Sequence, residues 1–198
     1  TKMDKISYAL GLNMANNLKA SGFSEINMEK FMKGMSDVFH RFQPEMSVEE
    51  AKQVLNTYFA KLQAEADEHN KKAGQEFLKE NLKRSEVKST ASGLQYEVLK
   101  EGTGDRPKET DTVRCHYEGR LIDGNIFDSS YSRNQPADFP VNQVIPGWVE
   151  ALQLMPVGSK WRLYIPSNLG YGEYGAGDVI GPNQTLIFEV ELLEILKK

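Results

Sequence analysis

The stretch NQVIPGWVEALQLM, residues 142–155, decides how the second half of the chain folds. Apolar residues recur at three-residue intervals from Val149 to Met155, which predicts a short helix, and Pro156 cannot continue it. The start of this helix lacks a polar capping residue and carries Trp148 instead. The role of a large aromatic ring at the start of a helix has to follow from the segments around it.

The segments on both sides of this helix alternate between apolar and polar residues with a period of two. They are rich in β-branched and aromatic residues, and Gly and Pro lie between them, which is typical of strands. A mostly antiparallel sheet with a single short helix must bury one face against that helix, so we predict an α+β domain. The predicted strands are LQYEVLK (94–100), TVRCHYEG (112–119), KWRLYIP (160–166) and TLIFEVELLEIL (185–196).

The first half of the chain has helical periodicity instead. Asp4 is expected to cap a first helix that ends near Gly22, and Asn27 precedes a second helix. Ser47 opens a capping box for a third helix that extends to about Arg84, a rod of roughly 50 Å. We therefore predict an all-α region followed by a sheet region.

The two short helices offer little surface to cover the exposed Met, Phe and Leu side chains of this first half. Either the three helices form a bundle within one subunit, or a second copy of the chain completes the apolar surface as a dimer. Beyond Leu62 the apolar pattern of the third helix thins out, which predicts a solvated second half. The expected division is a helical domain at 1–84, a small polar linker at 85–92 and a sheet domain at 93–198.

Composition narrows the functional classes. The 198 residues are 39% hydrophobic and 26% charged, as in soluble globular proteins, and no apolar run approaches a membrane span of ~20 residues. A net charge of −4 without a basic segment argues against nucleic-acid binding. Cys115 is the only cysteine, which excludes an internal disulfide, and its strand pattern predicts a buried, inert thiol.

Sequence motifs for cofactors, metals and covalent catalysis fail on inspection. GYGEYG (170–175) fits G-x-G-x-x-G, but Pro166 interrupts the strand before it and no long helix can follow. His40, His69 and His116 lie far apart and lack metal-ligand spacing. No G-x-S-x-G elbow supports a hydrolase. We expect neither a cofactor nor a metal.

A site built from aromatic walls with few polar groups is the remaining possibility. Trp148 opens a helix, Tyr171 and Ile180 lie in a Gly-rich loop, and Val144 and Ile145 lie in a Pro-flanked turn. Any one of these residues is more often part of a core than of a site. Their placement in loops and at element ends nevertheless favours a binding site.

Three long stretches of the sheet region resemble the FKBP-type peptidyl-prolyl isomerases. They occur in the order the family has them. The first half is similar to the helical dimerisation region of the bacterial macrophage infectivity potentiator group, chiefly in DKISYALGLNMANNL (4–18). The three stretches are HYEGRLIDGNIFDSS (116–130), QVIPGWVEALQLMPVGSKWRLYIPSNLGYG (143–172) and IGPNQTLIFEVELLEI (180–195).

The resemblance implies a bent, half-barrel antiparallel sheet wrapped on a short helix, with the active pocket between them. Trp148 would form the pocket floor, and the Ile145 backbone N–H would bind a substrate carbonyl. Ala137 stands where many members have a pocket phenylalanine, so Phe139 is assigned that role. The implied catalytic residues are Tyr117, Phe127, Asp128, Tyr171 and Phe188. The implied substrate-binding residues are Arg133, Phe139, Val144, Ile145, Trp148 and Ile180.

The implied function is rotation of X-Pro peptide bonds in folding clients, without covalent chemistry. Expected partners are proline-containing unfolded or partly folded polypeptides, macrolide immunosuppressant inhibitors and, through the N-terminal helices, a second copy of the chain. A chaperone or holdase with incidental turnover is the alternative, and an adhesion or scaffold protein ranks last. The chain begins at Thr1, so a leader could have been removed. Relatives of this type suggest the bacterial periplasm or envelope, with the cytoplasm as the other possibility.

Overall fold

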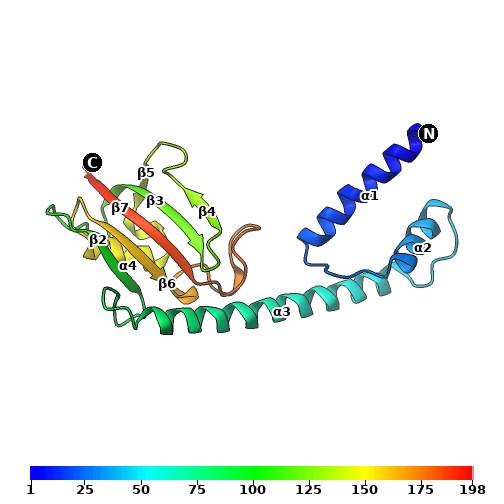
Figure 1. Ribbon diagram of the computed structural model, residues 1–198, viewed down its shortest axis with the longest axis horizontal. Helices are drawn as coiled ribbons and strands as arrows, with labels where there is room; N and C mark the ends of the chain where they lie inside the picture. The colour runs from blue at the N-terminus through cyan, green and yellow to red at the C-terminus, as the bar shows by residue number, and fades with distance from the viewer. Residues whose placement is uncertain (198) are drawn as a thin grey trace. The chain divides into compact units, whose positions relative to one another are not determined.

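The chain divides by its internal contacts into two units, Thr1–Leu62 and Gln63–Lys198. A computed structural model describes residues 1–197. The helices of the first half appear where the apolar periodicity predicts them (Figure 1). The third of them continues from the first unit into the second. These helices are α1 (Lys2–Ala20), α2 (Met28–Phe39) and α3 (Val48–Asn81).

Polar side chains cap the three helices, with one correction. Thr1, not Asp4, is the N-cap of α1, because Asp4 lies three residues further on and completes a capping box with the Thr1 backbone. Asn27 caps α2 as predicted. The Ser47 hydroxyl accepts the expected hydrogen bond at the start of α3, which ends at Asn81, slightly before the predicted end.

The N-terminal unit leaves most of its apolar side chains accessible. No residue of α1 is buried, and α1 and α2 border an apolar groove of about 1020 Å³. Phe23, in the segment between these helices, stacks on Tyr58 of α3 with ring centroids 5.3 Å apart. A few aromatic contacts thus support this unit, and the groove itself stays open.

The C-terminal unit is built on one antiparallel sheet, as the period-two pattern predicts. Strands follow the order β1-β2-β6-β7-β3-β4, and β5 pairs with β3. The longest pairing joins β3 and β7 from Thr112↔Leu196 to Leu121↔Leu186. The strands are β1 (Lys88–Ser89), β2 (Gln95–Lys100), β3 (Thr112–Leu121), β4 (Ile126–Ser129), β5 (Ala137–Pro140), β6 (Lys160–Ile165) and β7 (Leu186–Leu196).

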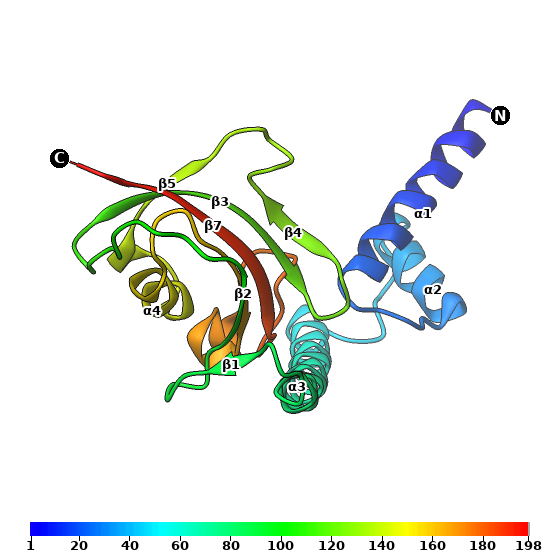
Figure 2. The ribbon, with the colours of Figure 1, turned by 60° about the vertical axis from the view of Figure 1, so that its left-hand side comes forward.

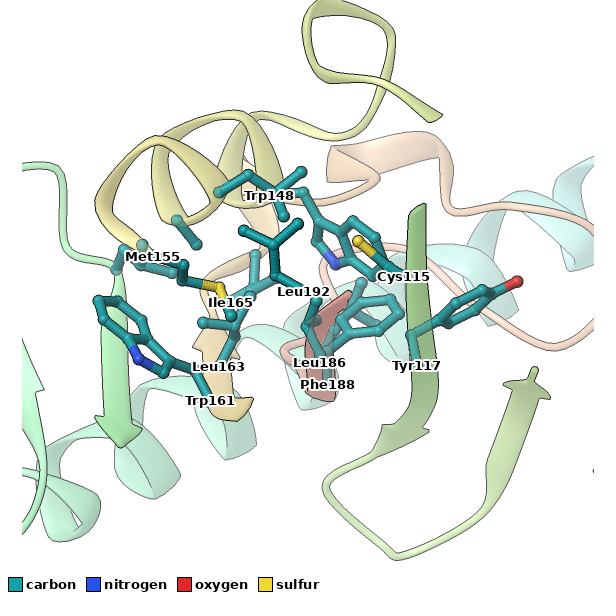
Figure 3. Close-up of a cluster of buried hydrophobic side chains, with 14 of the residues drawn as sticks. Cys115, Tyr117, Trp148, Met155, Trp161, Leu163, Ile165, Leu186, Phe188 and Leu192 are labelled. Carbon is teal, nitrogen blue, oxygen red and sulfur yellow. The ribbon is translucent and has the colours of Figure 1, made fainter. Parts of the chain in front are cut away.

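Helix α4 (Pro146–Leu154) lies in the concave side of this bent sheet (Figure 2). Pro146 starts the helix, where its missing N–H costs no hydrogen bond. Trp148 and Met155 of this segment lie in the main core together with Leu186 and Phe188 of β7, and the Trp148 ring meets that of Phe188 edge to face (Figure 3). Short 3₁₀ turns at Val141–Gln143, Ser167–Leu169 and Gly172–Tyr174 complete the unit. The α+β fold with a sheet wrapped on a short helix is confirmed.

The predicted inert cysteine is also confirmed. Cys115 on β3 is fully buried, and burial raises the pKa of its thiol to about 12.

The opposite face of the sheet is covered by the C-terminal half of α3, which corrects the prediction of a solvated rod. Phe77 and Leu78 pack against Tyr164 and Ile187. Polar contacts continue the attachment, since the Asn81 side-chain amide donates to Gln95 Oε1 at 2.9 Å. The thin apolar pattern after Leu62 concealed this packing because polar side chains make part of the attachment.

Val87 is buried in the segment 85–92, and Lys88–Ser89 pair with β2. The division at 1–84, 85–92 and 93–198 stays a prediction.

Candidate active site

A cavity of about 300 Å³ opens between α4 and the edge of the sheet. This volume is at the lower end of the range for small-ligand pockets. Its walls come from β3, β4, β5, β7, the entrance of α4 and the loop after β6. The lining residues are Tyr117, Phe127, Asp128, Phe139, Gln143, Val144, Ile145, Trp148, Tyr171 and Phe188.

Trp148 forms the centre of an aromatic cluster at this cavity. Its side chain is only 4% exposed, and three rings meet it edge to face. The centroids of Tyr117, Phe139 and Phe188 lie 5.4, 5.4 and 5.2 Å from that of the indole. Edge-to-face rings are the favoured arrangement of aromatic pairs, so this geometry fixes the indole as a rigid surface. The crowded entrance of α4 is thereby explained.

Gly119 on β3 makes room for two of these walls. A Cβ at this position would lie 2.6 Å from ring atoms of both Phe127 and Phe188. These two rings themselves pack edge to face with centroids 5.5 Å apart. Only glycine lets the β3 backbone approach them so closely.

Asp128 is the carboxylate of the cavity, and two donors hold it. The Tyr117 hydroxyl donates to Asp128 Oδ2 at 2.5 Å, and Arg133 Nη1 donates to Oδ1 at 2.5 Å. Arg133 Nη2 also donates to the Tyr117 hydroxyl oxygen at 3.0 Å. Figure 3 shows this hydroxyl pointing away from the core cluster. The three residues form one closed polar corner beside the aromatic walls.

Partial burial disfavours the charge on Asp128, but the hydrogen bonds from Tyr117 and Arg133 outweigh it and hold the pKa of this carboxyl below its usual range. Burial, followed by the hydrogen bond to Asp128, raises the pKa of Tyr117. Burial and the charge of Asp128 likewise raise the pKa of Tyr171. At neutral pH the corner therefore holds one carboxylate, one guanidinium and one neutral phenol, and the Tyr171 phenol is neutral as well.

The entrance of α4 presents a backbone donor. Ile145 is the N-cap residue, and its carbonyl accepts from the Trp148 and Val149 amides. Its own N–H donates no hydrogen bond to any part of residues 1–197. A free N–H beside an apolar cavity can bind a carbonyl oxygen of a ligand.

The structure brings the predicted site residues together with two exceptions. Arg133 reaches the cavity only through Asp128 and Tyr117. Ile180 is outside the lining because the backbone pair Ala176↔Ile180 folds its loop inward, and its 7%-exposed side chain packs in the core. Gln143 lines the cavity but was not predicted, since a polar residue in a loop gives no pattern; its position next to Val144 was the one available signal.

In the described part of the chain, no group of three or more His, Cys, Asp or Glu side chains is arranged to hold a metal ion. His116 instead hydrogen-bonds the Ser130 hydroxyl through Nδ1 at 2.8 Å and stacks on Tyr131. The groups that face the cavity are the aromatic walls, the polar corner and the residues at the entrance of α4.

Comparisons with known proteins identify the chain. Residues 104–193 match the family model described as FKBP-type peptidyl-prolyl cis-trans isomerase, and residues 3–98 match the domain amino terminal to such isomerases. The FKBP-type 22 kDa peptidyl-prolyl cis-trans isomerase of Escherichia coli is 47% identical over 96% of this chain and 94% of its own length. The outer membrane protein MIP of Legionella longbeachae is 43% identical over 100% of this chain and 87% of its own.

A solved structure agrees with the sequence relatives. The crystal structure of FkpA from Escherichia coli matches 98% of this chain and 94% of its own with a TM-score of 0.78 and 35% identity. The chain therefore belongs to the FKBP-type peptidyl-prolyl cis-trans isomerases, the enzymes that speed rotation about the peptide bond before proline.

Proposed function

We propose that the chain isomerises X-Pro bonds in folding protein clients by a non-covalent mechanism inside the Trp148 cavity. The observation that carries this proposal is a cavity of four aromatic walls and an indole floor, with a single ion-paired carboxylate. Rotation about a peptide bond meets a barrier of ~18–20 kcal/mol because amide resonance is lost. Uncatalysed X-Pro rotation is slow enough to limit folding.

Transfer from water to an apolar cavity favours the twisted bond over the planar one. The planar amide is strongly dipolar and water stabilises it, whereas the twisted transition state has less charge separation. A cavity that excludes water therefore stabilises the transition state relative to the ground state, which is the requirement for catalysis. Shape, desolvation and a few oriented hydrogen bonds suffice.

Each part of the site takes a role in this scheme. Trp148 supports the proline ring, and the walls formed by Tyr117, Phe127, Phe139 and Phe188 exclude water. Val144 adds apolar surface beside these walls. The Ile145 N–H binds a substrate carbonyl. These roles follow the lining and the free donor described above.

The polar groups orient the amide. The Tyr171 hydroxyl donates to the carbonyl that rotates, the Asp128 carboxylate polarises the twisted amide, and Arg133 keeps Asp128 ionised and in place. Macrolide immunosuppressants are expected to occupy the same cavity and to inhibit by excluding the substrate.

A protease-coupled assay of a proline peptide tests these roles. Asp128→Ala and Tyr171→Phe should each lower kcat/KM, and a macrolide should abolish the wild-type rate. Unchanged kcat/KM in both variants would remove the polar contribution, and a wild-type rate insensitive to the macrolide would argue against this cavity as the site.

We also propose a homodimer formed through the N-terminal helices. The supporting observation is the apolar groove along α1 and α2, because a monomer rarely exposes so continuous an apolar surface. Residues such as Leu10, Met14, Met35 and Phe39 line this groove. Sedimentation equilibrium of the purified protein at two concentrations tests it; a single monomer mass at both would contradict it.

The same groove supports a second candidate function, a chaperone that holds unfolded chains and isomerises them only incidentally. Refolding of a denatured client in the presence of Asp128→Ala, which leaves the hydrophobic core intact, separates the two. Full protection by this variant favours holding, and loss of protection favours isomerisation.

The bacterial periplasm or cell envelope is the proposed location. The support is a relative named as an outer membrane protein. Within residues 1–197, the helices are all too short or too polar to cross a membrane. Fractionation of the source cells tests the location: the protein should appear in the periplasmic or envelope fraction, and its recovery in the cytoplasmic fraction alone would contradict the proposal.

A further inference from the structure

A five-residue turn, Gly181–Thr185, lies between helix α3 and the loop that carries Tyr171. Asn183 at its centre has a left-handed φ of +53° and is 9% exposed. The Gly181 N–H donates to Gln184 Oε1 at 2.7 Å within the turn. Asn tolerates this left-handed conformation, but its buried side-chain amide needs hydrogen-bond partners.

Helix α3 supplies those partners from one of its faces. The Asn70 amide donates to the Pro182 carbonyl at 2.9 Å, and the Asn183 amide donates to Asp67 Oδ1. A Cβ on Gly74 would lie 2.4 Å from Thr185 Oγ1, so the helix backbone touches the end of the turn directly. The spacing of three and four residues places these helix positions side by side.

The turn is connected to the cavity through its other side. The Asn183 N–H donates to the Gly172 carbonyl at 2.9 Å, and Gly172 follows Tyr171 directly. At the other end of the loop, Ile180 and Ala176 exchange backbone hydrogen bonds of 2.8 and 3.2 Å immediately before the turn. The loop is thus closed on itself and fixed to α3 at one place.

Tyr171 depends on this fixation. Its side chain is 39% exposed, and within residues 1–197 its hydroxyl makes no hydrogen bond. Side-chain packing therefore constrains it weakly, and the backbone of the loop sets where its hydroxyl lies in the cavity.

We propose that Asp67 and Asn70 of helix α3 are positioning residues for the isomerase site. They hold the 181–185 turn, and through Gly172 the turn sets the position of the Tyr171 hydroxyl. This inference rests on the role of Tyr171 given under the proposed function. The C-terminal half of α3 thereby contributes to the geometry of the isomerase site.

Steady-state kinetics of the full chain with a proline peptide test the proposal. Asn70→Ala and Asp67→Ala should raise KM about threefold to tenfold with kcat nearly unchanged, the range in which one hydrogen bond changes an equilibrium. Asp67→Asn keeps an acceptor oxygen for Asn183 and should restore the wild-type KM. Failure of Asp67→Asn to do so would count against the proposal.

Two variants on the same helix separate positioning from general destabilisation. Asn81→Ala removes the hydrogen bond to Gln95 without touching the turn, and should lower stability while leaving KM as it is. Lys72→Ala changes an exposed position and should leave both unchanged. If Asn70→Ala resembles Asn81→Ala, with lower stability and the wild-type KM, the positioning role is overturned.

A double-variant cycle with Tyr171→Ala identifies the route. Asn70→Ala should have little further effect on KM once Tyr171 is absent, whereas independent, multiplicative effects would overturn the route through Tyr171. An effect of Tyr171→Ala without one of Asn70→Ala refutes the positioning role and leaves the proposed function intact. An unchanged KM and kcat in Tyr171→Ala refutes the role of Tyr171 in the proposed function itself.

Discussion

The N-terminal and C-terminal units bury their apolar side chains to opposite extents. Val38 and Phe39 of α2 are 74% and 77% exposed, whereas Leu186, Val190 and Leu192 of β7 are fully buried. The C-terminal unit therefore completes its own core. The N-terminal unit leaves an apolar surface in contact with water, and only a second surface packed against it would bury it. The buried core and the exposed apolar surface are therefore formed by separate sets of residues in the two units.

Trp148→Ala should have the largest effect on the C-terminal unit. Removing the indole leaves a cavity in the core, which should lower the free energy of unfolding by about 3–5 kcal/mol. The floor of the active cavity is lost as well, so kcat/KM should fall by more than tenfold. Urea unfolding and the protease-coupled assay measure the two effects. Trp148→Phe is the matched variant, and it should keep the fold with a smaller loss of activity.

A near-wild-type kcat/KM in Trp148→Ala would contradict the assignment of this cavity as the active site.

Gly119→Ala should have the next largest effect. The added methyl group must displace the rings of Phe127 and Phe188, which should cost about 1–3 kcal/mol and narrow the cavity. We expect lower kcat/KM and a lower melting temperature. Gly11→Ala is the matched change in the N-terminal unit, where nothing lies within 4 Å of the new Cβ, and it should leave kcat/KM unchanged. Equal kinetic effects of the two substitutions would show that kcat/KM is no more sensitive to a change in the C-terminal unit than to one in the N-terminal unit.

The aromatic walls could be predicted from the sequence, but the attachment of α3 could not. Trp148 stood out because a large ring at a helix entrance breaks the capping rules, and the family resemblance supplied the other walls. Helix α3 attaches through Asn70, Gly74 and Asn81, which give no apolar periodicity. Hydrophobic periodicity places such polar residues on the solvent side of a helix, because the pattern contains no information about their hydrogen-bond partners.

Other differences have equally local reasons. Thr1 rather than Asp4 caps α1, since an acidic residue is equally favourable three positions inside a helix. Ile180 was predicted on the basis of its loop, but a backbone pair with Ala176 turns it towards the core. Gln143 lies at the end of a short 3₁₀ turn that brings it to the cavity, and the sequence pattern did not predict this turn.

Arg133→Gln should have a moderate effect that depends on pH. Hydrogen bonds from Tyr117 and Arg133 hold the pKa of Asp128 below its usual range, so the wild-type carboxylate persists as the pH falls through the ordinary Asp pKa of about 3.9. Without the guanidinium this pKa rises, and the acidic loss of kcat/KM should begin at a higher pH. Profiles of kcat/KM that extend at least one pH unit below the ordinary Asp pKa of about 3.9 measure the displacement.

Arg114→Gln is the control for that profile, because Arg114 pairs with Asp138 at 2.9 Å outside the cavity. Its acidic limb should coincide with that of the wild type. Identical profiles for wild type and Arg133→Gln would mean that the ionisation of Asp128 does not limit catalysis.

The smallest effect on catalysis is expected from a charge placed in the groove of the N-terminal unit. Val38→Glu puts a carboxylate where the proposed dimer would desolvate it, so the protein should become monomeric. Small-peptide kcat/KM should stay within about twofold of the wild type, since the substitution leaves the C-terminal core intact. Met32→Glu adds the same charge to α2 at a 62%-exposed position outside the groove lining, and should keep the wild-type mass in sedimentation equilibrium. A wild-type mass for Val38→Glu would exclude the groove as the dimer surface, and a parallel fall of mass and kcat/KM would show that catalysis needs the partner subunit.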